Sequence, residues 1–308
     1  MKIHVIIDFM HIYYKYFFQL RAGKLKRLSA PIEWNGSVIE KDTSLIYYPL
    51  RDVEAIRKNL DQEHDVTVSV CFDMKSKRAT DESGEATDYK AGRQKTLQEE
   101  DMQNLAFIEK ALSEAGHNTY RIEGYEADDI VNHLSKEYMN DFDLTVIYTN
   151  DKDILVNVND RVTVMRFKQG KGYGQVTKAN YEQYLENEFG VYIPYNALGL
   201  FLSTVGDTAD HIKGINKFGK VAFKKLITKV ASSNSIDWTK CGDYSELAKV
   251  VEMCRAFLTD EQYSEMTNSF ALVSNITIPD GVAKPIKKST EELRRQAYMK
   301  YQMVSLVP

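Results

Sequence analysis

The sequence predicts an α/β fold in which a parallel sheet is flanked by helices. Its first half alternates short runs of aliphatic and β-branched residues with longer segments of helical periodicity, the pattern of strands joined by crossover helices. From residue 198 onward the pattern is mostly helical. With 308 residues, of which 43% are hydrophobic, the chain can bury one large core, or a core and a smaller second one.

Five strands and three helices carry this prediction in the first half of the chain. The strands are expected at residues 2–7, 66–72, 119–122, 144–149 and 162–167, which are short runs rich in apolar and β-branched side chains. The helices are expected at residues 50–60, 98–115 and 127–138. Because helical segments separate the strands, we expect the strands to pair in parallel.

Three further segments have patterns of their own. Residues 21–43 fit neither pattern, but Asn35-Gly36 is typical of a tight turn, so we expect a small β hairpin there. Residues 73–97 are polar, charged and too long for an ordinary connection, which is typical of a functional loop. A last, basic helix is expected to open at Ser289, because Glu292 three residues later completes a capping box.

The composition argues against membrane and zinc proteins. No apolar run approaches the ~18 to 20 residues of a membrane helix, and Asp8 interrupts the opening apolar run before a signal-peptide core could form. We therefore expect an intracellular protein. The three cysteines form no C-x-x-C pair and the six histidines no H-x-x-x-H pair. This argues against both a disulfide framework and a zinc site.

Acidic residues directly follow three of the expected strands. Asp8 and Asp73 each end a strand, and Asp151 and Asp153 follow a third. Because the carboxyl ends of parallel strands form the ligand-binding edge of an α/β sheet, we expect these acids to converge. Glu126, Asp128 and Asp129 stand at the start of the helix expected at 127–138. Asp207 and Asp210 are three residues apart, a spacing that places both on one face of a helical turn. The nine candidate ligands are Asp8, Asp73, Glu126, Asp128, Asp129, Asp151, Asp153, Asp207 and Asp210.

Nine carboxylates can share one pocket only if cations offset their charge, because like charges at close range raise one another's pKa. Oxygen ligands without histidine or cysteine select Mg²⁺ or Mn²⁺. Two such ions about 4 Å apart can activate a water and stabilise the departing 3′ oxygen of a phosphodiester. Each acid also has a purely structural explanation, since Asp128 and Asp129 suit a helix N-terminus and Asp8 or Asp73 could cap the next helix. All five acidic segments together predict a two-metal centre.

The net charge of −4 hides a segregation of charge along the chain. The sequence has 44 acidic and 40 basic residues, so without the nine candidate ligands it carries an excess of about five bases. The bases cluster at residues 21–27, 75–78, 90–95, 213–225 and 284–288. Such clusters are typical either of a solvated surface or of a surface that binds phosphates.

In its motifs the chain resembles the 5′-nuclease or flap endonuclease family, over roughly residues 1–280. This family includes the 5′-nuclease domain of bacterial DNA polymerase and stand-alone phage exonucleases. The shared motifs are Val-Ile-Ile-Asp8, Cys-Phe-Asp73, Asp-Tyr-Lys90-Ala-Gly-Arg93, Glu-Gly-Tyr-Glu126-Ala-Asp128-Asp129, Tyr-Thr-Asn-Asp151-Lys-Asp153 and Gly-Asp207-Thr-Ala-Asp210-His-Ile-Lys-Gly214-Ile. Each motif alone is weak, but their order and spacing together are highly specific.

The resemblance implies a PIN-like twisted parallel sheet with two additions. Residues 1–197 would form the catalytic domain, including a helical arch at about 74–97 that admits a single-stranded 5′ end. Residues 198–280 would form a helix-three-turn-helix subdomain of the helix-hairpin-helix type, and 281–308 a basic tail. The acids up to Asp129 would surround the cation nearer the attacking water, and those from Asp151 onward the second cation.

The arch would bring positively charged side chains and an aromatic ring to the substrate. Lys90 and Arg93 would sit above the metals, where a positive charge offsets the charge that builds on the phosphate in the transition state. Tyr89 and Arg78 would contact DNA. The aromatic residues after Asp8 could stack on unpaired bases, although at helical spacing they are more often core. They are Tyr13, Tyr14, Tyr16, Phe17 and Phe18.

The segment from Gly214 to Val221 nearly spells the phosphate loop of nucleotide hydrolases. However, Val221 replaces the hydroxyl that would hold Mg²⁺, and no strand precedes it. It fits better as a hairpin between two helices, where backbone amides at the start of the following helix hold a DNA phosphate. The resemblance implies a K⁺ on the hairpin carbonyls, which Lys217 puts in doubt because the family usually has Gly there. The expected DNA contacts are Gly214, Lys217, Gly219, Lys220 and Lys224.

The predicted function is that of a magnesium-dependent 5′-3′ exonuclease and flap endonuclease in replication or primer removal. Expected substrates are 5′ flaps, single-stranded 5′ ends, duplex DNA and RNA/DNA hybrids, bound without sequence preference because the basic groups reach phosphates. We expect a stand-alone monomer in the cytoplasm of a bacterium or a phage-infected cell. The alternatives are a PIN-type ribonuclease, which would lack the arch and the 206–225 module, and a non-catalytic protein that binds branched DNA, which would have lost metal-site acids.

Overall fold

The computed structural model describes residues 1–34, 37–77, 97–168, 172–273, 278–279, 281 and 286–306. These residues divide into two units. The first contains the described residues within Met1–Met74, Gln94–Asn150 and Ile278–Pro308, and the second those within Lys75–Arg93 and Asp151–Thr277. The units group the chain differently from the predicted domains, whose limits at 197 and 280 stay predictions.

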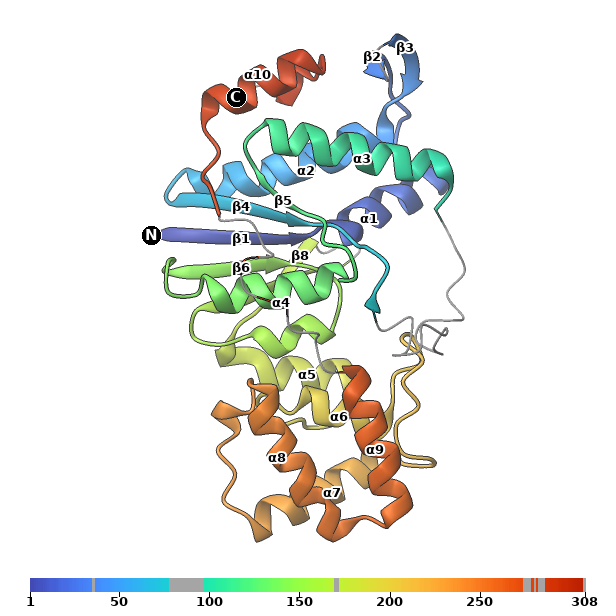
Figure 1. Cartoon of the computed structure of the whole chain (residues 1–308), viewed down its shortest axis with the longest axis vertical. Coiled ribbons are helices and arrows are strands. Elements are labelled where there is room, and N and C mark those ends of the chain that lie inside the picture. The colour runs from blue at the N-terminus through green and yellow to red at the C-terminus, as the bar shows by residue number, and fades with distance from the viewer. Residues whose placement is uncertain are drawn as a thin grey trace. The chain divides into compact units, whose positions relative to one another are not determined.

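The centre of the first unit is a parallel sheet in the order β5 (Asn118–Tyr120), β4 (Asp65–Cys71), β1 (Lys2–Asp8) and β6 (Leu144–Tyr148). Figure 1 shows β4, β1 and β6 side by side and pointing in the same direction. Five consecutive residues of β1 and six of β4 are buried, because both faces of the sheet are covered. The register sets Asp8 opposite Cys71, so the carboxyl ends of β1 and β4 meet at one edge.

Helices cover this sheet. α1 (Phe9–Arg21) packs against α2 (Ser44–Asp61), α2 packs against β4 and against α3 (Glu99–Glu114), and α4 (Ala127–Glu137) packs against β1 and β4. The C-terminal helix α10 (Glu291–Lys300) packs on α3, so the end of the described chain belongs to this unit (Figure 1). The predicted α/β class with a parallel sheet flanked by helices is confirmed.

A small antiparallel hairpin, β2 (Ser29–Trp34) and β3 (Ser37–Asp42), lies between α1 and α2 in the chain. The β hairpin predicted within residues 21–43 is therefore confirmed, while its turn residues Asn35 and Gly36 lie outside the described residues.

The second unit is built around helix α6 (Leu198–Val205). Seven of its eight residues are buried, as expected for a short helix that is apolar on all sides. It packs against α7 (Lys220–Ser233), α8 (Tyr244–Cys254), α9 (Asp260–Val273) and the 3-10 turn η2 (Asp153–Asn157). The predicted helical character after residue 198 is confirmed.

The remaining elements of this unit are short. They are the antiparallel pair β7 (Val162–Lys168) and β8 (Gly172–Val176), helix α5 (Tyr181–Phe189), and the 3-10 turns η3 (Lys178–Asn180), η4 (Trp238–Lys240) and η5 (Arg255–Phe257).

Two predicted helices differ from the structure in where they begin, and one strand was not predicted. Helix α2 begins at Ser44 rather than at residue 50, and it passes through Pro49, which is buried. Helix α10 begins at Glu291 and is capped by Thr290, whose hydroxyl accepts from the amide of Leu293, rather than by Ser289. Strand β8 was missed because its glycines give no strand signal.

Among the described residues, no helix has both the length and the apolar character needed to span a bilayer.

Candidate functional site

Asp8 stands at the end of β1 and begins the acidic edge of the first unit. Its Oδ1 accepts from the amide of Met10 (3.2 Å), so it caps α1, and its Oδ2 accepts from the hydroxyl of Thr149 just after β6 (2.7 Å). Burial raises the pKa of the Cys71 thiol, and the carboxylates of Asp8 and Asp73 raise it further. Both acids therefore lie near the end of β4, as the strand-end prediction requires.

Asp73 connects the end of β4 to the start of α4. Its Oδ1 accepts from the amide of Ala127, the first residue of α4 (2.8 Å). The helix begins with three acids, Glu126, Asp128 and Asp129, each of which has a carboxylate oxygen within 4.8 Å of those of the other two. These three acids form the first acidic group. The Asp73 carboxylate is linked to this group by its hydrogen bond to the Ala127 amide.

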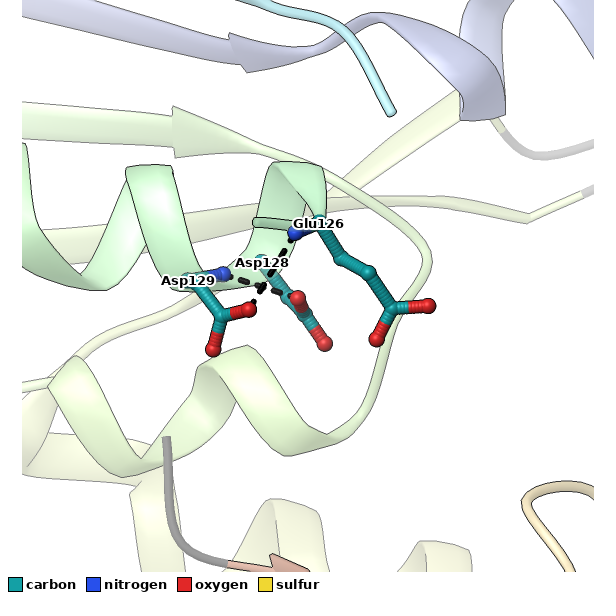
Figure 2. Close-up of side chains that lie close together, drawn as sticks. All are labelled: Glu126, Asp128 and Asp129. Atoms are coloured by element: carbon teal, nitrogen blue, oxygen red, sulfur yellow. Dashed lines mark hydrogen bonds between the residues drawn. The ribbon is translucent and has the colours of Figure 1, made fainter. Parts of the chain in front are cut away.

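Figure 2 shows the three side chains of the first acidic group around the start of α4. Asp128 Oδ1 accepts from the amide of Asp129 (2.8 Å), and Asp129 Oδ2 accepts from the amide of Glu126 (3.2 Å). Asp129 is fully buried. Positive helix N-terminal amides stabilise these charges, so the residues that cap the helix are also those that could hold a cation.

Arg121 is a neighbour of this group that the sequence did not reveal. Its guanidinium bonds to Glu109 (2.6 Å), lies over the ring of Phe72 at 5.1 Å, and donates to the carbonyl of Asp73 (3.4 Å). This last hydrogen bond helps to fix the backbone of Asp73. Only the fold brings Arg121 to Asp73, since 48 positions separate them.

The second acidic group lies in the second unit and consists of Asp153, Asp207 and Asp210, whose carboxylate oxygens also lie within 4.8 Å of one another. Asp153 opens η2, which packs on α6, and its amide donates to Asp151 Oδ1 (2.9 Å). Because η2 packs on α6, Asp153 lies beside the helix that directly precedes Asp207.

A closed turn, rather than the predicted helical turn, holds Asp207 and Asp210 together. Asp207 and Ile212 exchange both backbone hydrogen bonds (2.7 and 2.8 Å). Gly206 and Gly214 flank this turn with positive φ, and a Cβ on Gly214 would come within 2.4 Å of the Gly206 amide nitrogen. Only glycine permits this approach, so the two glycines fix the place of both acids.

The second group is electrostatically strained. Burial raises the pKa of Asp153 well above its usual range, and the nearby Asp151 raises it further. Asp153 Oδ1 is buried without a hydrogen-bond partner. Burial lowers the pKa of Lys152, but the carboxylates of Asp153 and Asp207 outweigh this and hold it above the usual value. Lys152 forms an ion pair with Asp207.

Both groups fit hard divalent cations. Their donors are carboxylate oxygens, the ligands that Mg²⁺ and Mn²⁺ prefer. The buried, unpartnered oxygen of Asp153 is the kind of atom that a bound cation would satisfy. Of the nine predicted ligands, the first unit holds Asp8, Asp73, Glu126, Asp128 and Asp129, and the second holds Asp151, Asp153, Asp207 and Asp210. That all nine share one pocket stays a prediction.

The predicted DNA-binding hairpin connects α6 to α7. Helix α7 begins at Lys220, and Gly219 is its N-cap, with no side chain to bond the first amides. Lys217 adopts a positive φ of 57°, a conformation that glycine tolerates more readily. Lys217, Lys220 and Lys224 are all exposed. The segment therefore starts a helix after a turn, and the element directly before it is helix α6 rather than the strand that a nucleotide-binding loop requires.

The aromatic residues after Asp8 are mainly core. Tyr13, Tyr16 and Phe17 are buried, as expected for helical spacing. Phe18 is 56% exposed and stacks on Tyr14, with ring centroids 5.9 Å apart. The arch residues Arg78, Tyr89, Lys90 and Arg93 lie outside the described residues.

The sequence of this chain matches known proteins. Residues 3–190 match the family model described as 5′-3′ exonuclease, N-terminal resolvase-like domain. The 5′-3′ exonuclease of Bacillus subtilis (strain 168) is 32% identical over 164 residues, which cover 52% of this chain and 51% of that protein. DNA polymerase I of Caldicellulosiruptor bescii is 25% identical over 255 residues, covering 83% of this chain. The matched region spans only 28% of that polymerase.

Solved structures share the fold. A crystal structure of the bacteriophage T5 D15 flap endonuclease, in a pseudo-enzyme-product complex with DNA and metal ions, aligns with a TM-score of 0.51 at 14% sequence identity. The alignment covers 88% of this chain and 99% of that one.

Proposed function

Because this chain belongs to the family of 5′-3′ exonucleases with an N-terminal resolvase-like domain, we propose that it hydrolyses DNA from 5′ ends and cleaves 5′ flaps with two divalent cations. The observation that carries this proposal is the pair of acidic groups, each with three carboxylates within 4.8 Å of one another. Two of the proteins named above support it: one is a 5′-3′ exonuclease, and the other is a flap endonuclease in a complex with DNA and metal ions.

The candidate ligands divide between two cations. We infer that Glu126, Asp128 and Asp129 hold the first, together with Asp8 and Asp73. Asp153, Asp207 and Asp210 would hold the second, together with Asp151. When bound, two Mg²⁺ or Mn²⁺ ions supply an activated water and stabilise the departing 3′ oxygen.

The chain's own contribution is to hold the carboxylates before substrate arrives. Asp8 is fixed by the Met10 amide and the Thr149 hydroxyl, and Asp73 by the Ala127 amide. Groups fixed in this way need little reorganisation when charge develops on the phosphate. Lys90 and Arg93, which the sequence places on the arch, would add positive charge beside the scissile phosphate.

The start of α7 is the proposed anchor for duplex DNA. Exposed lysines at 217, 220 and 224 and the uncapped first amides of α7 can meet a phosphate strand. Gly219, which is exposed, would let the backbone approach the phosphates. A contact at Gly214 and a K⁺ on this hairpin are proposed with it. Tyr89, Arg78 and the stacked pair of half-buried Tyr14 and exposed Phe18 would serve unpaired bases and their backbone. RNA/DNA hybrids belong to the proposed substrates, since phosphates are the main contact.

The test is cleavage of end-labelled single-stranded, duplex and 5′-flap DNA with Mg²⁺ and with chelator. We expect 5′-flap cleavage and shortening from 5′ ends with Mg²⁺, and neither with chelator. The Asp153→Asn variant, purified in the same way, controls for contaminating nucleases. Cleavage that persists in chelator, or the lack of any DNA cleavage with Mg²⁺, would contradict the proposal.

A further inference from the structure

Lys152 lies between Asp151 and Asp153 in the chain, and its side chain turns toward Asp207 of the second group. Its ammonium forms an ion pair with Asp207 Oδ2. The Lys152 side chain is only 22% exposed and that of Asp207 only 7%, so the pair is largely shielded from water. Shielded pairs are screened less by solvent than surface pairs.

The two oxygens of Asp207 are both engaged in hydrogen bonds. Oδ1 accepts from the amide of Ala209 (3.0 Å), and Oδ2 accepts from Lys152. Asp153 differs, because its Oδ1 is buried and has no hydrogen-bond partner. The group therefore presents an unsatisfied oxygen on Asp153 and an Asp207 that already holds a positive charge.

Three carboxylates this close repel one another unless a positive charge lies among them. Lys152 supplies one such charge from the chain itself. A divalent cation that uses Asp207 must take its place, because two positive charges in one small site also repel. The ammonium and the cation thus compete for the same carboxylate.

We propose that Lys152 is a resident counter-cation of the second acidic group: it neutralises Asp207 in the metal-free protein and is displaced when a divalent cation binds there. This inference rests on the proposed cation at Asp153, Asp207 and Asp210. Lys152 acts as a positioning residue that keeps the metal-free group folded and weakens cation binding. The apparent affinity of the site falls because only the state with Lys152 released can bind the cation.

The test measures Mn²⁺ binding and thermal unfolding of the full chain, without DNA, for wild type and Lys152→Met. We expect the variant to bind the second Mn²⁺ about fivefold or more tightly, as loss of a competing ion pair implies. In chelator the variant should unfold at a lower temperature than wild type, and saturating Mn²⁺ should close that gap. Lys152→Arg, which keeps the charge, should restore weak binding.

Lys178→Met is the matched control, because Lys178 pairs with Asp160 (2.7 Å) at an exposed position of the same unit. It should change neither Mn²⁺ affinity nor the effect of Mn²⁺ on unfolding. Lys152→Gln, which keeps a donor but no charge, provides a second variant with the same expected direction if Lys152→Met folds poorly.

The outcomes separate this inference from the proposed function. Two Mn²⁺ sites with equal or weaker affinity in the neutral variants would overturn the role of Lys152 and leave the two-cation proposal standing. A single Mn²⁺ site, unaffected by Asp153→Asn, would overturn the second cation site and the role of Lys152 with it.

Discussion

At Asp153, burial and neighbouring charge both oppose ionisation. The pKa of this carboxyl is raised well above its usual range, first by burial and then by Asp151, and one of its oxygens has no partner. A residue that only stabilised the fold would gain from a hydrogen-bond donor at that oxygen. Strain that persists at one position is typical of a functional site.

Asp153→Asn should abolish cleavage and leave DNA binding within a few-fold of wild type, because it removes a proposed cation ligand and no proposed phosphate contact. Without metal, the variant should unfold at the same temperature or a higher one, since it relieves repulsion in the second group. Single-turnover cleavage, DNA binding and thermal unfolding measure these effects. Asp160→Asn, an exposed acid paired with Lys178, is the control. Full activity in Asp153→Asn would remove the two-cation model.

Lys90→Ala should slow the chemical step by about 10² to 10³, the loss typical when one charge-stabilising donor is removed from an active site. Single-turnover rates at saturating protein separate this effect from weaker binding. Lys90→Arg should retain part of the rate, since it keeps the charge. A single-turnover rate equal to wild type would reject the placement of Lys90 beside the phosphate.

The sequence pattern located the acidic side chains but not the residues that contact them. Most of the acids stand at strand ends and at a helix start, so local patterns locate them. Thr149 and Arg121 were missed because their contacts depend on the fold: Thr149 bonds to Asp8 across 141 positions. Lys152 was visible in the motif, but its pairing with Asp207 required the packing of η2 on α6.

At the scale of elements, α7 is the proposed anchor for duplex DNA. Lys220→Ala with Lys224→Ala should weaken duplex binding and reduce the slope of log affinity against log salt by about 1 to 2, because each lysine releases about one counterion. Titrations at several salt concentrations measure the slope. Lys240→Ala with Lys249→Ala removes two lysines whose partners are Asp237 and Glu246, and serves as the control. An unaltered slope would count against α7.

Helix α10 is held to the first unit by a buried carboxylate. Glu54 accepts from Tyr298 on α10 (2.6 Å), from His117 (2.6 Å) and from Arg57 (2.9 Å). Burial alone would raise the pKa of Glu54, but these partners lower it to about 2. Helix α10, which lies within the tail predicted at 281–308, is therefore part of the fold of this unit. The sequence could not show this, because 244 positions separate Glu54 from Tyr298.

This network predicts a loss of stability in acid. The folded pKa of Glu54, about 2, lies below its ordinary value of 4.5, so the stabilisation is complete above about pH 4.5 and is lost as the pH falls toward 2. Tyr298→Phe should lower the free energy of unfolding by about 2 kcal/mol at neutral pH, as expected for a hydrogen bond to a charged group. That difference should shrink as the pH falls below about 4.5.

Urea unfolding of wild type and Tyr298→Phe between about pH 7 and pH 3 measures this difference. Tyr263→Phe, which removes a hydroxyl bonded to Glu252 in an exposed setting, is the control and should change stability little. A stability difference for Tyr298→Phe that does not change with pH would contradict the assigned role of Glu54.

At the scale of the molecule, the alternation of strands and helices sufficed to predict a parallel sheet, because both faces of such a sheet must be covered by the connecting helices. The four parallel strands of the first unit lie within two residues of their predicted bounds. The division into two units could not be predicted from the sequence, because the C-terminal residues that follow the second unit in the chain belong to the first unit. The arch residues stay a prediction.

The proposed function depends on two acidic groups that bind divalent cations. Anomalous diffraction from crystals soaked in Mn²⁺ measures this binding directly. We expect one peak among Glu126, Asp128 and Asp129 and another among Asp153, Asp207 and Asp210. Crystals that show no anomalous peak at either group would contradict it.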